Sequence, residues 1–154
     1  MGAAYFYHLT ERPLEATLPI LLGKALQAGW RVEVRGTDAA ALDRLDTLLW
    51  LGDGFLPHGV AGGPHDAEQP VLLTTGAGGN AATCVMSVDG AEVTADEVSG
   101  LERACVLFNG ADLAAVETAR GQWRRLTEAG VAAQYWAEDG GRWVKKAESG
   151  TASG

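Results

Sequence analysis

The Gly-rich segment at residues 76–81, GAGGNA, comes nearest to a known chemical motif. It fits the GxGxxA form of a dinucleotide-binding turn and follows the apolar run VLLTT. In such a site a helix begins directly after the turn, and its N-terminus binds the pyrophosphate. Here the residues from Thr83 to Val88 have the composition of a strand, which leaves no room for that helix. A Gly-rich connection is therefore favoured, and a small nucleotide- or dinucleotide-binding enzyme that uses this turn is the alternative.

The other side chains that take part in catalysis or metal binding in proteins are scattered along this chain. The histidines, His8, His58 and His65, do not have the spacing of a metal site. Cys84 and Cys105 lie in apolar, strand-like runs and are expected to be buried small hydrophobic residues. The P-loop and GxSxG motifs are absent. We therefore expect no cofactor, no metal and no catalytic activity.

The charge of the chain limits its partners. It carries 12 Lys and Arg against 20 Asp and Glu, for a formal net charge of −8. Affinity for nucleic acid comes largely from basic side chains that neutralise phosphates, so direct DNA binding is not expected. A local basic patch can still bind an acidic peptide. The N-terminus lacks a signal-peptide pattern and no apolar run is long enough to span a membrane, which predicts a cytoplasmic protein.

Residues 50–62, WLGDGFLPHGVAG, place large apolar side chains at a helix end and on a loop without regular periodicity. Long loops of this kind are often functional. Trp50, Phe55 and Pro57 must either pack inward or meet a partner, and Trp is enriched at the energetic centres of interfaces. The sequence leaves both possibilities open, because a place over the core of their own domain also fits Trp50 and Phe55.

A helix expected at 112–129 is the second candidate contact region. At 100° per residue, its buried stripe would consist of Leu113, Val116, Ala119, Trp123 and Leu126. Arg120 and Arg124 stand four residues apart at the edge of that stripe. Two guanidinium groups beside apolar surface suit a carboxylate with an adjacent hydrophobic side chain. Alternatively, Glu117 and Glu128 would form ion pairs with Arg120 and Arg124 within the helix and neutralise both arginines.

The elements that must position these residues can be predicted from the hydrophobic pattern, which indicates strands and helices in alternation. Strands are expected at 3–9, 31–35, 71–75, 83–88, 104–108 and 131–136, and helices at 13–28, 39–50, 94–101 and 112–129. This order predicts a three-layer α/β/α Rossmann-like sandwich with a mainly parallel sheet. A single domain over residues 1–147 would be followed by a small, polar, disordered tail at 148–154.

In the order and spacing of its motifs, the chain resembles the chi subunit family of bacterial DNA polymerase III over most of residues 3–136. The likeness rests on the opening AAYFYHL, on AGWRVEVRG after the first helix, and on LDRLDTLLW running into GDGFLPHGVAG and VLLTT. The most specific part is LDxLLW followed shortly by FxPHxxAG. The likeness is much looser after residue 76.

The resemblance implies a non-catalytic accessory subunit of a DNA-directed DNA polymerase holoenzyme that binds no nucleotide. Members of the family act in the clamp-loader assembly during DNA replication. They link the psi subunit to the acidic, Phe-terminated C-terminal tail of the single-stranded-DNA-binding protein. The partners implied for this chain are therefore psi, or another clamp-loader protein, and that tail.

The family's binding residues can be carried over onto matching positions. Trp50, Phe55, Pro57 and His58 would belong to the psi-binding surface. In the helix at 112–129, Arg120 would match a basic residue of the tail-binding site, and Arg124 is a further candidate for the same site. Val116 departs from the pattern, because better-known members carry a lysine at that position.

Overall fold

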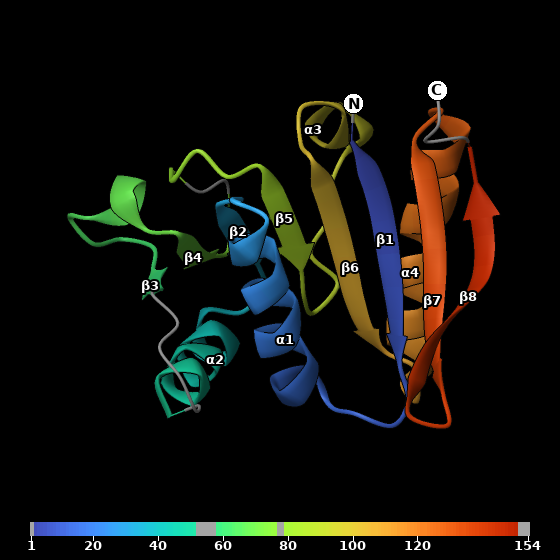
Figure 1. Cartoon of the computed structure of the whole chain (residues 1–154), viewed down its shortest axis with the longest axis horizontal. Helices are drawn as coiled ribbons and strands as arrows, with labels where there is room; N and C mark the ends of the chain where they lie inside the picture. The colour runs from blue at the N-terminus through green and yellow to red at the C-terminus, as the bar shows by residue number, and fades with distance from the viewer. Residues whose placement is uncertain (1, 52–57, 77–78, 151–154) are drawn as a thin grey trace.

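The computed structural model describes residues 2–51, 58–76 and 79–150 and shows an eight-stranded sheet with helices on both faces (Figure 1). The strand order is β3-β4-β2-β5-β6-β1-β7-β8. The strands are β1 (Ala3–Leu9), β2 (Val32–Arg35), β3 (Gly59–Val60), β4 (Val71–Thr74), β5 (Cys84–Ser87), β6 (Arg103–Asn109), β7 (Ala132–Asp139) and β8 (Arg142–Ser149). Only β8 is antiparallel to its neighbour, so the predicted three-layer, mainly parallel arrangement is confirmed.

The helices are α1 (Leu14–Gln27), α2 (Ala39–Leu51), α3 (Ala95–Ser99) and α4 (Leu113–Glu128), with a short 3-10 helix, η1 (Asp66–Glu68). Helices α1 and α2 share one core layer with the sheet, and α3 and α4 share the other. Side chains of strand β1 enter both core layers, because Phe6 packs in the layer of α4, whereas Tyr7 and Leu9 pack in the layer of α1 and α2. Of the helices in the described segments, none is long and apolar enough to cross a membrane.

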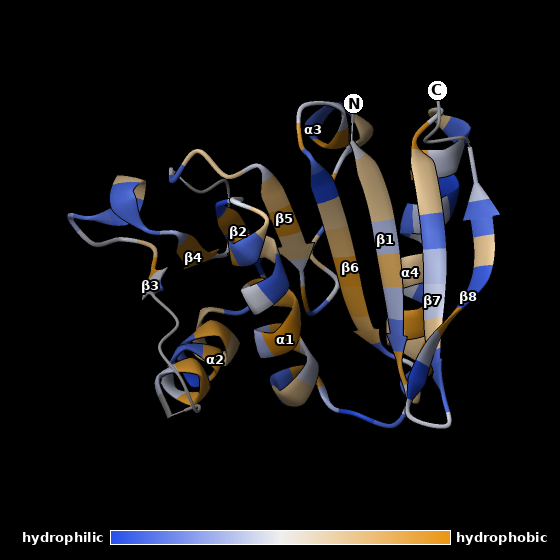
Figure 2. Ribbon diagram, viewed as in Figure 1, coloured by the Kyte–Doolittle hydropathy of each residue, from blue (hydrophilic) through white to orange (hydrophobic). Residues whose placement is uncertain are grey.

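Strand β8 is the main departure from the sequence prediction. We expected the last strand to end at residue 136 and a disordered tail to begin at residue 148, but β7 continues to Asp139 and β8 runs to Ser149. Glu148 and Ser149 pair with Gln134 and Ala133. The strand was missed because β8 is an exposed edge with charged side chains, which lacks an apolar alternation. Figure 2 shows its more hydrophilic colouring beside the central strands.

The hairpin of β7 and β8 is fastened to the loop between β1 and α1. One carboxylate oxygen of Glu138 accepts hydrogen bonds from the backbone N–H groups of Thr10, Glu11 and Arg12 at 3.1–3.2 Å. In return, the Glu11 carboxylate accepts one from the N–H of Gly141 at 3.1 Å. These reciprocal bonds hold the hairpin against the rest of the domain.

Candidate partner-binding surfaces

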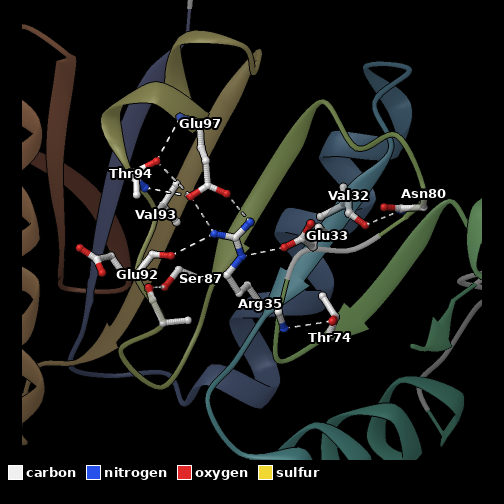
Figure 3. Close-up of polar contacts among 12 residues, drawn as sticks. Val32, Glu33, Arg35, Thr74, Asn80, Ser87, Glu92, Val93, Thr94 and Glu97 are labelled. Carbon is white, nitrogen blue, oxygen red and sulfur yellow. Dashed lines mark hydrogen bonds and ion pairs between the residues drawn. The ribbon is translucent and has the colours of Figure 1, made fainter. Parts of the chain in front are cut away.

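Arg35 lies at the centre of the most densely bonded polar cluster of the described chain (Figure 3). Its guanidinium group donates to Glu33 at 2.7 Å, to both carboxylate oxygens of Glu97 at 3.0 and 2.7 Å, and to the carbonyl of Glu92 at 3.0 Å. Glu97 also closes a capping box with Thr94 at the start of α3. The cluster therefore ties β2 to α3 and to the loop before it.

The Arg35 cluster is structural rather than a candidate for catalysis. The hydrogen bonds that Arg35 donates to Glu97 raise the pKa of Arg35 and lower the pKa of Glu97 below its ordinary value. Both groups are therefore held in their charged forms, and neither is prepared to exchange a proton near neutral pH. The RVEVR pattern could have indicated the contact between Glu33 and Arg35, since alternate residues of a strand lie on one face of β2.

Arg120 and Arg124 lie one turn apart on the exposed side of α4. Within the described residues, no carboxylate oxygen lies within 4.0 Å of either guanidinium group. The alternative of intrahelical pairs with Glu117 and Glu128 is therefore not what the structure contains. Arg125, by contrast, lies 3.5 Å from a carboxylate oxygen of Glu92. The helix thus presents two cations without an ion-pair partner among the described residues.

Beside Arg120 lies a pair of residues that the sequence did not connect, His8 and Tyr135. The Tyr135 hydroxyl and Nδ1 of His8 are 2.7 Å apart and share a hydrogen bond. Burial lowers the pKa of His8, and the charge of Arg120 lowers it further. Burial also raises the pKa of Tyr135, against the influence of the same arginine. Arg120 therefore lies next to a neutral polar pair at the carboxyl half of the central strands.

Aromatic rings surround this pair. The His8 ring lies 5.2 Å from the ring centre of Phe108 and 5.8 Å from that of Tyr135, and Trp123 lies 5.9 Å from Tyr135. A side chain at Gly110 would collide with the His8 ring, so this close approach requires glycine. His8, near the end of β1, thus has a hydrogen-bond partner within the chain. The surface beside Arg120 thus combines a cation with half-buried aromatic rings.

The buried face of α4 differs from the predicted stripe at one end. Val116, Ala119, Gln122 and Leu126 are buried, but Leu113 is 82% exposed. Leu113 is the first residue of the helix, directly after the Asp112 cap, where α4 has not yet come to lie on the sheet core. Gln122 is buried because it donates to the Ala91 carbonyl and accepts from the Val93 N–H. Val116 packs in the core, so its position supplies no cation to the surface.

Trp50, on α2, forms the second candidate surface. Its side chain is 55% exposed, so it does not serve mainly to cover the core. The indole ring lies against the imidazole of buried His58, with ring centres 4.2 Å apart. Nε2 of His58 lies 3.1 Å from a carboxylate oxygen of Asp46 and 3.3 Å from its carbonyl. His58 therefore supports Trp50 from beneath, and Asp46 orients His58. Phe55 and Pro57 lie outside the described residues.

The GAGGNA segment connects β4 to β5, and β5 begins at Cys84 without an intervening helix in the described part of the chain. The Asn80 amide donates to the carbonyls of Val32 and Gln69, and Arg31 donates to the Asn80 carbonyl. These bonds attach the loop to β2 and to the segment before β4. A dinucleotide turn needs a helix N-terminus at this place, so the geometry favours a structural connection.

Open α/β sheets usually bind nucleotides in a crevice at the carboxyl ends of their strands. A cavity of about 480 Å³ lies there, and Glu15, Asp89 and Asp112 are among its lining residues. Asp112 already accepts hydrogen bonds from the N–H groups of Ala114 and Ala115 at the start of α4. Carboxylates therefore border the crevice, and these two amide groups of α4 are already in use, which does not suit phosphate.

Comparison with known protein families identifies the family of the chain. The sequence model of the family described as DNA polymerase III chi subunit, HolC, matches residues 1–134 of the chain. A search of curated proteins returned no match. Because the matched region spans most of the 154 residues, the chain belongs to the DNA polymerase III chi subunit family and is an accessory subunit of that polymerase.

Proposed function

We propose that this chain is a non-catalytic adaptor that links the clamp loader, through psi or an equivalent protein, to the C-terminal tail of the single-stranded-DNA-binding protein. The surface formed by Arg120 and Arg124 would bind the acidic tail. The surface formed by Trp50 and His58 would bind the clamp-loader partner. The protein would act in the cytoplasm, in DNA replication.

The proposal that the chain binds the acidic tail rests on the two exposed arginines of α4. In a chain with a net charge of −8, Arg120 and Arg124 have no ion-pair partner within the described residues. Charge-assisted bonds between guanidinium and carboxylate groups are among the stronger hydrogen bonds in proteins. Leu113 is exposed two turns earlier on the same side of the helix, about 10 Å from Arg120 along the axis. Cations and an exposed leucine together suit an acidic peptide with an apolar end.

The second surface has the properties of an interface anchor. Trp50 is more than half exposed, yet its ring is held by the stack on His58. A large aromatic side chain that is already oriented loses little conformational freedom when a partner covers it. This supports a protein partner at the end of α2.

The two surfaces lie on opposite sides of the sheet, because α2 packs in one core layer and α4 in the other (Figure 1). One partner therefore does not block the other. An adaptor needs this separation in order to hold both at once. The acidic charge of the chain also argues against direct DNA binding, since contact with DNA would then go through the single-strand binder.

The experiment that tests the proposal uses two variants as controls for each other. The tagged wild type, Trp50→Ala and Arg120→Ala proteins are incubated with extract of the source bacterium, and the captured proteins are identified by mass spectrometry. The wild type should capture clamp-loader subunits and the single-strand binder. Trp50→Ala should lose the former, and Arg120→Ala the latter. Circular dichroism checks that both variants are folded.

Two results would refute the proposal. Capture of neither protein by the wild type would remove the adaptor function. Loss of both partners in one folded variant would show that the two surfaces are not independent. A heat of binding with ATP, GTP or NAD in calorimetry would instead revive the nucleotide-dependent alternative.

A further inference from the structure

A second cavity, of about 510 Å³, lies on the α1 side of the sheet. Its floor comes from β1, β5 and β6, one wall from α1, and the opposite wall from the β7–β8 hairpin. We call it the aromatic pocket and define it by Tyr5, Tyr7, Trp30, Arg103, Trp136 and Trp143. Figure 1 shows that α1 stands over β5, so that no helix covers β1 and β7 on this side.

Contacts within the chain hold the walls of the aromatic pocket in place. The ring of Trp143 meets that of Tyr7 edge to face, with centres 5.3 Å apart. The Trp136 indole N–H donates to the Gln134 side chain at 3.1 Å. The reciprocal bonds of Glu138 and Glu11 fix the hairpin that carries both tryptophans. A preformed pocket is the usual condition for small-molecule binding.

Arg103 gives the pocket its charge. Its guanidinium carbon lies 4.0 Å from the ring centre of Tyr5 and 5.1 Å from that of Trp30. Among the described residues, its buried Nε has no hydrogen-bond partner and its guanidinium group has no ion pair. A buried donor without a partner is costly, which points to an acceptor that the described part of the chain does not supply.

The rest of the lining reinforces this charge. Arg12 and Lys24 also border the pocket, and no Asp or Glu is found among its described lining residues. The cavity at the carboxyl ends of the strands has the opposite character, with Glu15, Asp89 and Asp112. In an acidic protein, the aromatic pocket is therefore a local site of positive charge.

We propose that the aromatic pocket binds a small organic anion, namely a carboxylate carried on a flat, apolar body. The volume and the mainly apolar lining with a few polar groups are those of small-molecule sites. Trp136, Trp143 and Tyr7 would contact the flat body by ring stacking and edge contacts. Arg103 would bind the carboxylate with a charge-assisted hydrogen bond.

This site is independent of the adaptor surfaces. None of Trp50, His58, Arg120 and Arg124 borders the aromatic pocket. Trp136 and Trp143 also lie beyond residue 134, where the family match ends, so the hairpin wall is not part of that match. A result that refutes the adaptor function would therefore not refute anion binding in the aromatic pocket. A result that refutes anion binding would likewise not refute the adaptor function.

The test compares two probes of equal shape, 1-naphthaleneacetate and the neutral 1-naphthaleneacetamide. Each is titrated into the full-length, ¹⁵N-labelled protein, and the tryptophan indole N–H signals are followed by NMR. The acid should bind saturably and at least about tenfold more tightly than the amide, because only the acid can form a charged bond with Arg103. The signals of Trp30, Trp136 and Trp143 should move, whereas those of Trp50 and Trp123 should not.

Two sets of variants locate the site. Arg103→Met keeps an apolar side chain without the charge and should remove the preference for the acid. Ile20 borders the pocket and is 48% exposed, so changes there should not disturb folding. Ile20→Glu should weaken binding of the acid by about tenfold through charge repulsion, and Ile20→Gln should not.

Equal affinities for acid and amide, or no saturable binding at millimolar concentrations, would overturn the proposal. Movement of the Trp50 or Trp123 signals in place of the other three would also overturn it. Displacement of the probe by an acidic peptide with a C-terminal Phe would show that the pocket serves a protein partner and not a small anion.

Discussion

Arg35 and Arg120 are the same kind of side chain in opposite situations. Arg35 is nearly buried and donates hydrogen bonds to two carboxylates and a carbonyl. Arg120 is exposed, and its clearest influence is electrostatic, on His8 and Tyr135. An arginine whose donors are used within its own chain stabilises the fold. An arginine whose donors are unused is available for another molecule.

The largest expected effect concerns the buried arginine. Arg35→Ala should lower the free energy of unfolding by about 2–4 kcal/mol, because Glu33 and Glu97 lose the charge that balances them. The loss should be smaller than for a fully buried pair, since the Glu97 side chain is 36% exposed. Urea unfolding followed by tryptophan fluorescence measures the change. Arg120→Ala is the control and should stay within about 0.5 kcal/mol of the wild type. Similar losses of stability in both variants would show that the hydrogen bonds of Arg35 do not stabilise the fold more than an exposed arginine does.

The next effect concerns the binding of the tail. Arg120→Ala should weaken binding of an acidic peptide that ends in Phe by about 1.5–3 kcal/mol, because a charge-assisted hydrogen bond is lost. Titration of a fluorescently labelled peptide gives the affinities. Arg125→Ala is a matched control on the same helix, since Arg125 already pairs with Glu92. Equal affinities of the wild type and Arg120→Ala would take Arg120 out of the site.

Salt should have a smaller effect on the same contact. Between about 0.1 and 1 M salt the Debye length falls from about 10 to about 3 Å, so exposed charges act over a shorter range. Affinity of the wild type for the peptide should therefore fall several-fold over this range. The double variant Arg120→Ala, Arg124→Ala should lose less. An affinity of the wild type that does not depend on salt would indicate a purely apolar site.

The smallest effect is the pH dependence of the Arg35 cluster. Bonds from Arg35 lower the pKa of Glu97 from an unfolded value of about 4.5. A carboxyl group with a lowered pKa stabilises the folded state above its unfolded pKa, and this contribution is lost as the pH falls through the folded pKa. The difference in stability between the wild type and Glu97→Gln should thus be constant above pH 5 or so and shrink in acid. Equilibrium unfolding at several pH values checks this, and a difference that grows in acid would contradict it.

Most of the fold was predictable because its central strands are continuous apolar runs and its helices begin or end at clear residues. The AAYFYHL and VLLTT runs became β1 and β4, and α4 begins after Asp112, which caps it. Strand β3 has two residues, and β8 is held by pairing with β7 and not by its own composition. Neither of these two strands has a hydrophobic periodicity that the sequence alone would reveal.

The candidate site was only partly predictable. Helical spacing placed Arg120 and Arg124 together, whereas the position of Trp50 at a helix end left open whether its side chain is exposed. The bond between His8 and Tyr135 joins residues 127 positions apart, and that between Arg35 and Glu97 joins residues 62 positions apart. Such contacts depend on the crossing of strands in the sheet, which no local pattern reports. Leu113 was placed wrongly because periodicity gives the face of a helix but not where the helix leaves the core.

The pairing of β7 has a consequence for how fragments of this chain should be chosen. The family signature stops at residue 134, but β7 continues through Tyr135, Trp136 and Ala137, which pair with Phe6, Tyr7 and His8. A polypeptide cut at the signature's end would leave that half of β1 as an uncovered border. An apolar strand with unpaired amide groups recruits other chains. A fragment that keeps β1 paired with β7 must therefore extend past residue 134, and one that also keeps the pairing of β7 with β8 must extend through Ser149.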